Sequence, residues 1–231
     1  MEVFFVYIRG DDMRMTLHDI TFDDILHYAN ISKEHIDDRM MKDIIEMKEL
    51  VLSLSEPRVT YQIFPLENGQ LKNCTLKLKG NDIQRLLKES HACVILAATL
   101  GNKIDRKMKQ IQMQNMTKAL FFDCCANAAI ETVCDLFQEK MTNQYPYLTD
   151  RFSCGYGDMP VELQKEFIDT LDATKKIGLF VNENSILLPL KSVTAIIGIA
   201  DKIQPAMVRG CNVCQMKEIC ELRKRGSYCG K

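Results

Sequence analysis

Four cysteines near the end of the chain have the spacing of a candidate metal site. Cys211, Cys214, Cys220 and Cys229 form a C-x2-C-x5-C-x8-C pattern. Thiolates bind zinc and iron–sulfur clusters, and a C-x2-C pair can place two sulfur atoms on one metal. The pattern therefore predicts either a zinc site or an iron–sulfur cluster. The alternative is a reduced, cysteine-rich tail that holds no metal.

A second candidate is the stretch RFSCGYGDMP, residues 151–160, whose composition is that of a shaped loop. Arg151 carries a rigid donor fork that suits a carboxylate. Gly155 and Gly157 permit unusual backbone angles and let the backbone approach a ligand closely. As a loop residue, Arg151 is expected to lie outside the core.

Two further side chains of this stretch complete the chemistry of a possible ligand site. Tyr156 offers a ring face and a hydroxyl group, and Asp158 could accept a hydrogen bond from an ammonium group. Together with Arg151 they match a zwitterionic, amino-acid-like ligand that carries an aromatic base. The alternative is a surface loop in which Arg151 forms a salt bridge and Asp158 caps the helix that follows Pro160.

The composition argues against several classes of function. The 231 residues include 30 Lys+Arg and 31 Asp+Glu, so the net charge of −1 indicates no surface for nucleic acid and no polybasic membrane anchor. The longest apolar runs are too short to span a bilayer. The first residues, MEVFFVYIRGDD, lack a secretory n-region, so we expect a cytoplasmic protein whose ten cysteines are thiols or metal ligands.

Common catalytic fingerprints are missing from the sequence. It contains no Gly-x-Ser-x-Gly elbow, no Walker loop, no Rossmann glycine pattern and no HExxH motif. Cys124, Cys125 and Cys134 fall on a predicted long helix, where cysteine packs as a small hydrophobic residue. We therefore predict no catalytic residue.

The elements that must position these candidates alternate between strand and helix patterns. Strand patterns cover residues 3–8, 92–101 and 177–181 and much of 186–201, and an Asn68-Gly69 turn predicts a β-hairpin over 58–80. Helix patterns cover residues 21–29, 36–55, 81–87, 116–141 and 161–176. Pro189 should lie at an edge, bend or bulge of the sheet. The composition changes at Pro205, which predicts one domain over residues 1–204 and a cysteine-rich tail over 205–231.

Two motifs make the chain resemble the activation (reactivation) domain of cobalamin-dependent methionine synthase, in its short free-standing form. The first is Arg-x-x-x-Gly-Tyr, from Arg151 to Tyr156, followed by a helix that begins after Pro160. The second lies in residues 177–198, where a polar-Glu-polar turn follows a glycine and precedes a strand with Pro and then Ser-Val. The family positions in that motif are held by Gly178, Glu183, Pro189, Ser192 and Val193.

The resemblance implies a C-shaped α/β (α+β) fold, with an antiparallel twisted sheet flanked by helices and a shallow site for S-adenosylmethionine. It also implies an accessory component of a methyltransferase of methionine biosynthesis, not a complete enzyme. The partner would be a cobalamin-dependent methionine synthase or a related corrinoid protein, which itself holds the cobalamin. An electron donor such as flavodoxin or ferredoxin would take part in reactivation.

The resemblance also implies roles for individual residues. Arg151 would hold the carboxylate of the ligand, and the backbone from Cys154 through Tyr156 would line its adenosyl portion. Asp158 and Glu183 would contact the ammonium group or the ribose. The full candidate set for cofactor binding is Arg151, Cys154, Gly155, Tyr156, Gly157, Asp158, Glu183 and Ser192.

Cys154 departs from the family pattern, which commonly has Pro at this position. The alternative function is a redox or regulatory protein on the same fold, whose cysteine cluster holds iron–sulfur or zinc and which binds no methyl donor.

Overall fold

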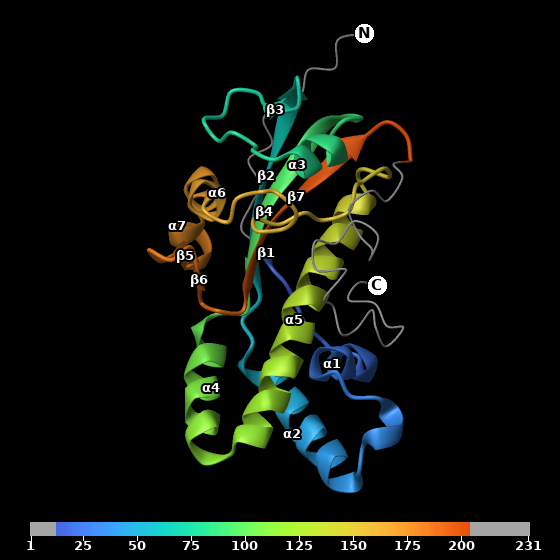
Figure 1. The fold of residues 1–231 in the computed structure, drawn as a ribbon, viewed down its shortest axis with the longest axis vertical. Helices are drawn as coiled ribbons and strands as arrows, with labels where there is room; N and C mark the ends of the chain where they lie inside the picture. Colours follow the sequence, from blue (N-terminus) through green and yellow to red (C-terminus); the bar gives the residue numbers. More distant parts are fainter. Residues whose placement is uncertain (1–12, 204–231) are drawn as a thin grey trace.

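The computed structural model describes residues 13–203. The strand predicted over residues 3–8 lies outside these residues, as do the four tail cysteines and the domain boundary predicted at residue 204. Figure 1 shows that the described chain places a sheet at one end of an elongated molecule and a group of helices at the other.

An antiparallel sheet forms the centre of the fold, with strand order β1-β2-β4-β7 and a short β3 paired to the end of β2. Its strands are β1 (Met13–Arg14), β2 (Arg58–Glu67), β3 (Gln70–Leu71), β4 (Ser90–Thr99) and β7 (Ser192–Ala200). β4 pairs with β2 on one side and with β7 on the other, and residues 92–99 are all buried. The strand predicted over 92–101 is therefore confirmed.

Side chains of β4 alternate between two hydrophobic cores, one on each face of the sheet. Ala92, Val94 and Leu96 belong to the core that also contains buried residues of α1, α2, α4 and α5. Cys93 and Ile95 belong to the second core, with residues of α3, α6 and α7. The helices are α1 (Phe22–Ala29), α2 (Asp38–Leu54), α3 (Asn81–Leu86), α4 (Asn102–Gln114), α5 (Met116–Thr142), α6 (Leu163–Leu171) and α7 (Ala173–Ile177), with a 3-10 turn at Lys33–His35. The predicted fold class, an antiparallel sheet flanked by helices, is confirmed.

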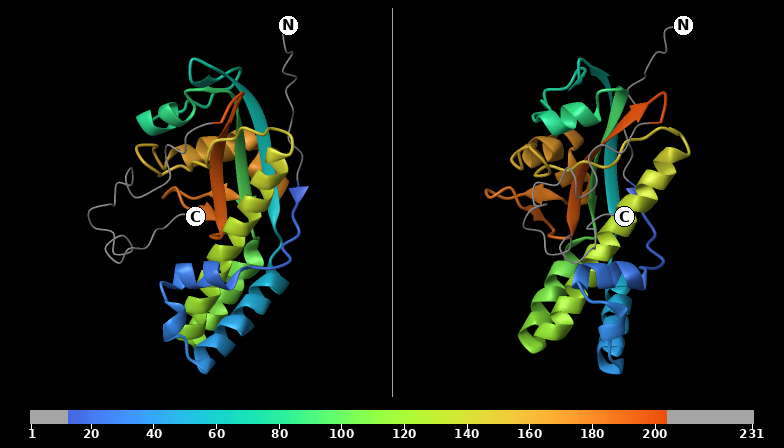
Figure 2. Two further views of the ribbon diagram at one scale, coloured as in Figure 1. Left: turned by 90° about the vertical axis from the view of Figure 1, so that its right-hand side faces the viewer. Right: turned by 45° about the vertical axis from the view of Figure 1, so that its right-hand side comes forward.

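The long helix α5 connects the two ends of the molecule (Figure 2). It packs against α1, α2 and α4 and also contacts β4. Its small residues Cys125, Ala126 and Ala129 are fully buried, which permits this close packing. In the part of the chain that the structure describes, no helix combines the length and the apolar character needed to cross a membrane.

The hairpin predicted over 58–80 is right in its turn and wrong in its second strand. Asn68 and Gly69 both have positive φ angles, 52° and 72°, as a tight hairpin turn requires. The returning strand, β3, has only two residues, and the chain beyond it is bonded to the side-chain amide of Gln70. Gln70 Nε2 donates to the carbonyl oxygen of Leu78, and its Oε1 accepts from Leu78 N, each at 3.0 Å.

The helix predicted over 161–176 is divided into α6 and α7. Asp172 lies between them with a φ of 53°, in the left-handed region that ends a helix. The break lets Ala173 and Ile177 turn into the second core, where both are buried. Downstream, β5 (Phe180–Val181) and β6 (Leu187–Leu188) form a small hairpin. Pro189 follows β6 at the bend that leads into β7, as predicted.

Candidate functional site

The backbone that carries Arg151 is attached to the outer edge of β7. Phe152 N donates to Ile196 O at 2.9 Å, and Ile196 N donates to Phe152 O at 2.8 Å. Thr149 N donates to Gly198 O at 3.0 Å, and the Thr149 hydroxyl accepts from Gly198 N at 2.8 Å. These bonds fix the chain on both sides of Arg151 to the central sheet.

The rest of the Arg151 loop, residues 151–158, closes on itself. Gly155 N donates to Met159 O, Met159 N donates to Tyr156 O, and Tyr156 N donates to Ser153 O, at 3.0 to 3.1 Å. Gly155 and Gly157 have φ angles of 88° and 52°, which L side chains disfavour. Met159 is buried beneath the loop, whereas Tyr156 is 62% exposed. The loop therefore presents backbone and one aromatic ring to solvent, as its composition predicts.

Arg151 differs from the expectation that it lies outside the core. Its side chain is only 8% exposed, because its guanidinium lies against α5. One terminal nitrogen donates to Asp135 at 2.6 Å and to Glu131 at 3.2 Å, and the other donates to Gln138 Oε1 at 2.9 Å. The salt bridge considered in the alternative interpretation is thus present, with partners from a different element.

The three α5 partners share one face of that helix because they lie at positions i, i+4 and i+7. The side chains of Glu131 and Asp135 remain 42% and 45% exposed. One buried cation therefore lies beside two carboxylates that still reach solvent. Such an arrangement can offer a cation and an anion to the same small ligand.

Tyr28, on α1, belongs to the same neighbourhood. Its pKa is raised above the usual range by partial burial and by the neighbouring charges of Glu131 and Tyr156. Its hydroxyl group is protonated at neutral pH, as that of an ordinary tyrosine is, and can donate a hydrogen bond. Sequence reasoning missed Tyr28, Glu131 and Asp135. The signal for Glu131 and Asp135 was a pair of acids spaced by four on a mostly apolar helix, and Tyr28 had none.

Asp158 is bonded to a helix distant in sequence, not to the helix that follows it. Its two carboxylate oxygens accept from Asn81 N at 2.6 Å and from Asp82 N at 3.0 Å, at the start of α3. Hydrogen bonds from Asp82 N and Asn81 N lower the pKa of Asp158. The capping role of the alternative interpretation is therefore present, but it serves α3 and not α6.

Cys154 turns its side chain inward. The thiol packs against the second core, and burial raises its pKa to about 12, although a hydrogen bond with the Thr194 side chain acts in the opposite direction. The group is therefore a neutral thiol at physiological pH and a poor nucleophile. What Cys154 can offer a ligand is its backbone.

Glu183 and Ser192 belong to elements other than the Arg151 loop. Glu183 is exposed in the turn between β5 and β6. Ser192 begins β7, and its hydroxyl donates to Pro189 O at 2.7 Å and lies 2.8 Å from Thr99 Oγ1. Ser192 precedes Ile196 by four strand residues, roughly 13 Å along β7. The structure thus groups the candidates from Arg151 to Asp158 and leaves Ser192 in a structural hydrogen-bond pair at the other end of the strand.

The metal prediction rests on cysteines outside the described residues. Within residues 13–203 no group of three or more His, Cys, Asp or Glu side chains is arranged to hold a metal ion. Cys124, Cys125 and Cys134 are buried, and burial raises the pKa of each thiol to about 11, 12 and 12. Their predicted role in core packing is confirmed.

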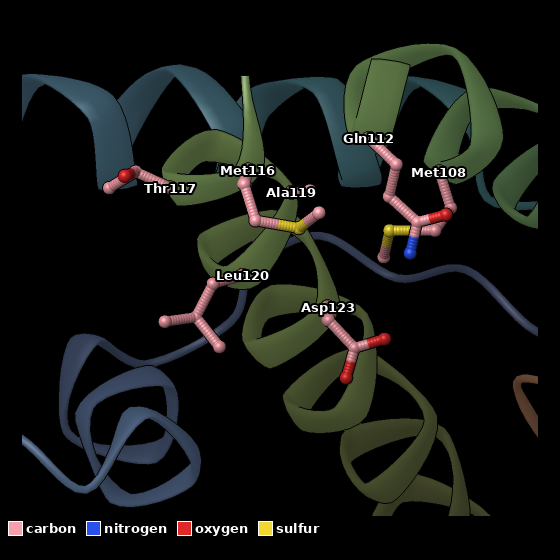
Figure 3. Close-up of a pocket in the computed structure, with 7 residues that line it drawn as sticks. All are labelled: Met108, Gln112, Met116, Thr117, Ala119, Leu120 and Asp123. Atoms are coloured by element: carbon pink, nitrogen blue, oxygen red, sulfur yellow. The ribbon is translucent and has the colours of Figure 1, made fainter. Parts of the chain in front are cut away.

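A pocket of about 440 Å³ lies between α4 and α5 (Figure 3). Its lining is mostly apolar, and its carboxylate, Asp123, pairs with Lys191 at 2.7 Å. Asp123 precedes Asp135 by twelve residues, which is about 18 Å along α5. The residues that line the pocket are Met108, Gln112, Met116, Thr117, Ala119, Leu120 and Asp123.

Comparisons with known proteins identify the fold. No family model matches the sequence, and no curated protein matches it. Among solved structures, the crystal structure of the MetH reactivation domain bound to AdoHcy matches with a TM-score of 0.60 and 12% sequence identity. The match covers 97% of this chain and 88% of that chain. The chain therefore has the fold of the MetH reactivation domain, which is the fold that the sequence motifs predicted.

Proposed function

We propose that this chain is an S-adenosylmethionine-binding accessory protein for the reductive methylation and reactivation of a cobalamin-dependent methionine synthase. The observation that carries the proposal is the fold shared with a reactivation domain that was crystallised with AdoHcy. A second support is the Arg151 loop. It is hydrogen-bonded to β7, and its arginine lies beside two partly exposed carboxylates on α5. No membrane and no nucleic acid enter this function.

The proposed ligand is a zwitterion at its methionine end, so its carboxylate and ammonium groups sit on one carbon atom. Arg151 would bind the carboxylate through its planar fork. Glu131 or Asp135 would bind the ammonium group, since both carboxylates are partly exposed next to that fork. Because Arg151 already contacts both acids, the ligand must displace or share one of these ion pairs.

The adenosyl end would lie along the backbone from Cys154 to Tyr156. Gly155 lets this backbone adopt a positive φ, and the exposed ring of Tyr156 offers a face for the base. In this arrangement Gly157 would let the loop backbone turn with a positive φ angle, and Glu183 would reach the ligand from the β5–β6 turn. Ser192 would hold the start of β7 in place through its hydrogen bond to Pro189 O.

Reactivation, as proposed, would move the methyl group of the bound sulfonium to a cobalamin held by the partner, with one electron from a donor such as flavodoxin or ferredoxin and with S-adenosylhomocysteine as the product. The residues of this chain bind and orient the methyl donor and exclude water from it. No general acid or base is needed for this transfer, which agrees with the missing catalytic fingerprints in the sequence.

A calorimetric titration of the purified chain with S-adenosylmethionine tests the binding half of the proposal. We expect saturable binding of one ligand per chain. If no heat of binding appears while anaerobically purified protein contains iron or zinc, the alternative of a cysteine-cluster redox or regulatory protein is the better account.

A further inference from the structure

The Arg151 loop and the start of α3 are joined by a contact that the proposed ligand does not explain. Asp158 lies 76 residues after Asp82, yet both oxygens of its carboxylate accept backbone hydrogen bonds from α3. α3 has no side-chain cap from its own N-cap residue, Gly80. Asp158 thus supplies from the loop the acceptor that a helix start normally receives locally.

The contact is reciprocal, because each segment has a glycine where the other approaches. A Cβ atom on Gly80 would lie 2.6 Å from Asp158 Oδ1, and one on Gly157 would overlap the Asp82 carboxylate. Both glycines also have positive φ angles, 115° and 52°. A side chain at either position would therefore crowd the other segment, and both backbone angles favour glycine.

α3 is itself fixed to the protein interior. Ile83, Leu86 and Leu87 are buried in the second core together with Phe152 and Met159 from the two ends of the loop region. The helix is thus a rigid support beneath the loop, and the Asp158 carboxylate is the polar link between them. The exposed side of the loop, with Tyr156, remains open to solvent.

We propose that Asp158 is a positioning residue: through α3 it holds the backbone of residues 154–157 in the shape that receives the ligand. This role differs from the direct ligand contact expected from the sequence, since both carboxylate oxygens are used by α3. The consequence for ligand affinity rests on the proposed function, whereas the consequence for the shape of the loop does not.

The test compares Asp158→Ala, Asp158→Asn and a matched control, Asp37→Ala, in the full chain. Asp37 also caps a helix, accepting from Met40 N at 2.7 Å at the start of α2. Each alanine variant loses one cap, but Asp158→Ala loses two hydrogen bonds and Asp37→Ala loses one, so both should lower the melting temperature and Asp158→Ala somewhat more. Only Asp158→Ala should speed the amide hydrogen exchange of Gly155, Tyr156 and Met159, by about tenfold or more, since these amides hold the loop closed.

The same variants are titrated with S-adenosylmethionine. Asp158→Ala should weaken binding at least several-fold, Asp158→Asn should recover part of the loss because its amide oxygen still accepts one N–H bond, and Asp37→Ala should bind like the wild type. Should Asp158→Ala fail to fold, Gly80→Ala breaks the same contact from the side of α3 and should produce the same faster exchange in the loop.

The outcomes separate the two proposals. Unchanged exchange in the loop of Asp158→Ala would overturn the inference, and so would weaker binding without faster exchange, which would make Asp158 a ligand contact. If the wild type does not bind S-adenosylmethionine but Asp158→Ala still loosens the loop, the positioning role stands and the proposed function fails.

Discussion

At the scale of single residues, Arg151 is the side chain on which the proposed site depends most. Its position in a loop, its type and its neighbouring glycines were accessible from the sequence. Its burial against Glu131 and Asp135 was not, because those partners lie 20 and 16 residues away on a helix whose orientation only the folded chain determines. The same is true of Asp158, whose partner helix is remote in sequence.

Replacing Arg151 tests its role as a carboxylate clamp. Arg151→Ala should weaken binding of S-adenosylmethionine by about 10- to 150-fold, since a charge-assisted hydrogen bond contributes roughly 1.5–3 kcal/mol. Arg151→Lys should recover only part of this, because lysine keeps the charge and loses the planar fork. Calorimetric titration of the three proteins measures the effect.

The same substitution should also cost stability, in contrast to the expectation for a loop residue. The guanidinium is buried, but its carboxylate partners are partly exposed and can be hydrated when it is lost. We therefore expect Arg151→Ala to lower the free energy of unfolding by about 1–2 kcal/mol. Equal affinity of the folded alanine variant and the wild type would reduce Arg151 to a structural ion-pair residue.

At the scale of elements, the periodic patterns were sufficient to locate α1, α2, α5, β4 and β7. They missed α4, and they failed where the second hairpin strand stops early and where a helix turns. Beyond the short β3, the Gln70 side chain bonds to the backbone of Leu78, and Asp172 divides a predicted helix by adopting a left-handed conformation. Neither event changes the hydrophobic period, so neither is visible in the pattern.

The attachment of the Arg151 loop to β7 should be measurable as stability. The buried Thr149 hydroxyl accepts from Gly198 N, so Thr149→Val leaves that N–H without this acceptor. We expect a loss of about 1–3 kcal/mol in the free energy of unfolding. Thr132→Val on α5 is the control, since the Thr132 hydroxyl only adds a bond to the carbonyl oxygen of Ala128. Denaturation by urea gives both values, and equal small losses would mean that the Thr149 bond does not anchor the loop.

At the scale of the whole molecule, the fold and its match to a reactivation domain agree with the motifs around Arg151 and Glu183. The two-part organisation, with a domain over residues 1–204 and a tail over 205–231, is a prediction from composition alone. The metal in the tail matters for function. An iron–sulfur cluster there could relay the electron needed for the proposed reactivation, whereas zinc would have a structural role.

Metal analysis addresses the tail directly. Anaerobically purified protein should contain about one zinc ion or one iron–sulfur cluster per chain, bound by Cys211, Cys214, Cys220 and Cys229. The double variant Cys211→Ser, Cys214→Ser should lose it while the remaining domain stays folded. Well under one equivalent of either metal in the wild type would exclude this site.

The central claim is that the chain reactivates a partner enzyme by presenting a methyl donor. The most direct measurement is the recovery of methionine synthase activity in an inactivated, cobalamin-dependent enzyme from the same cell, supplied with a reductant and S-adenosylmethionine. We expect activity to return only when this chain is present, Arg151→Ala to slow its return, and the chain alone to make no methionine from homocysteine. Recovery that is equally fast without the chain would rule out an accessory role for it.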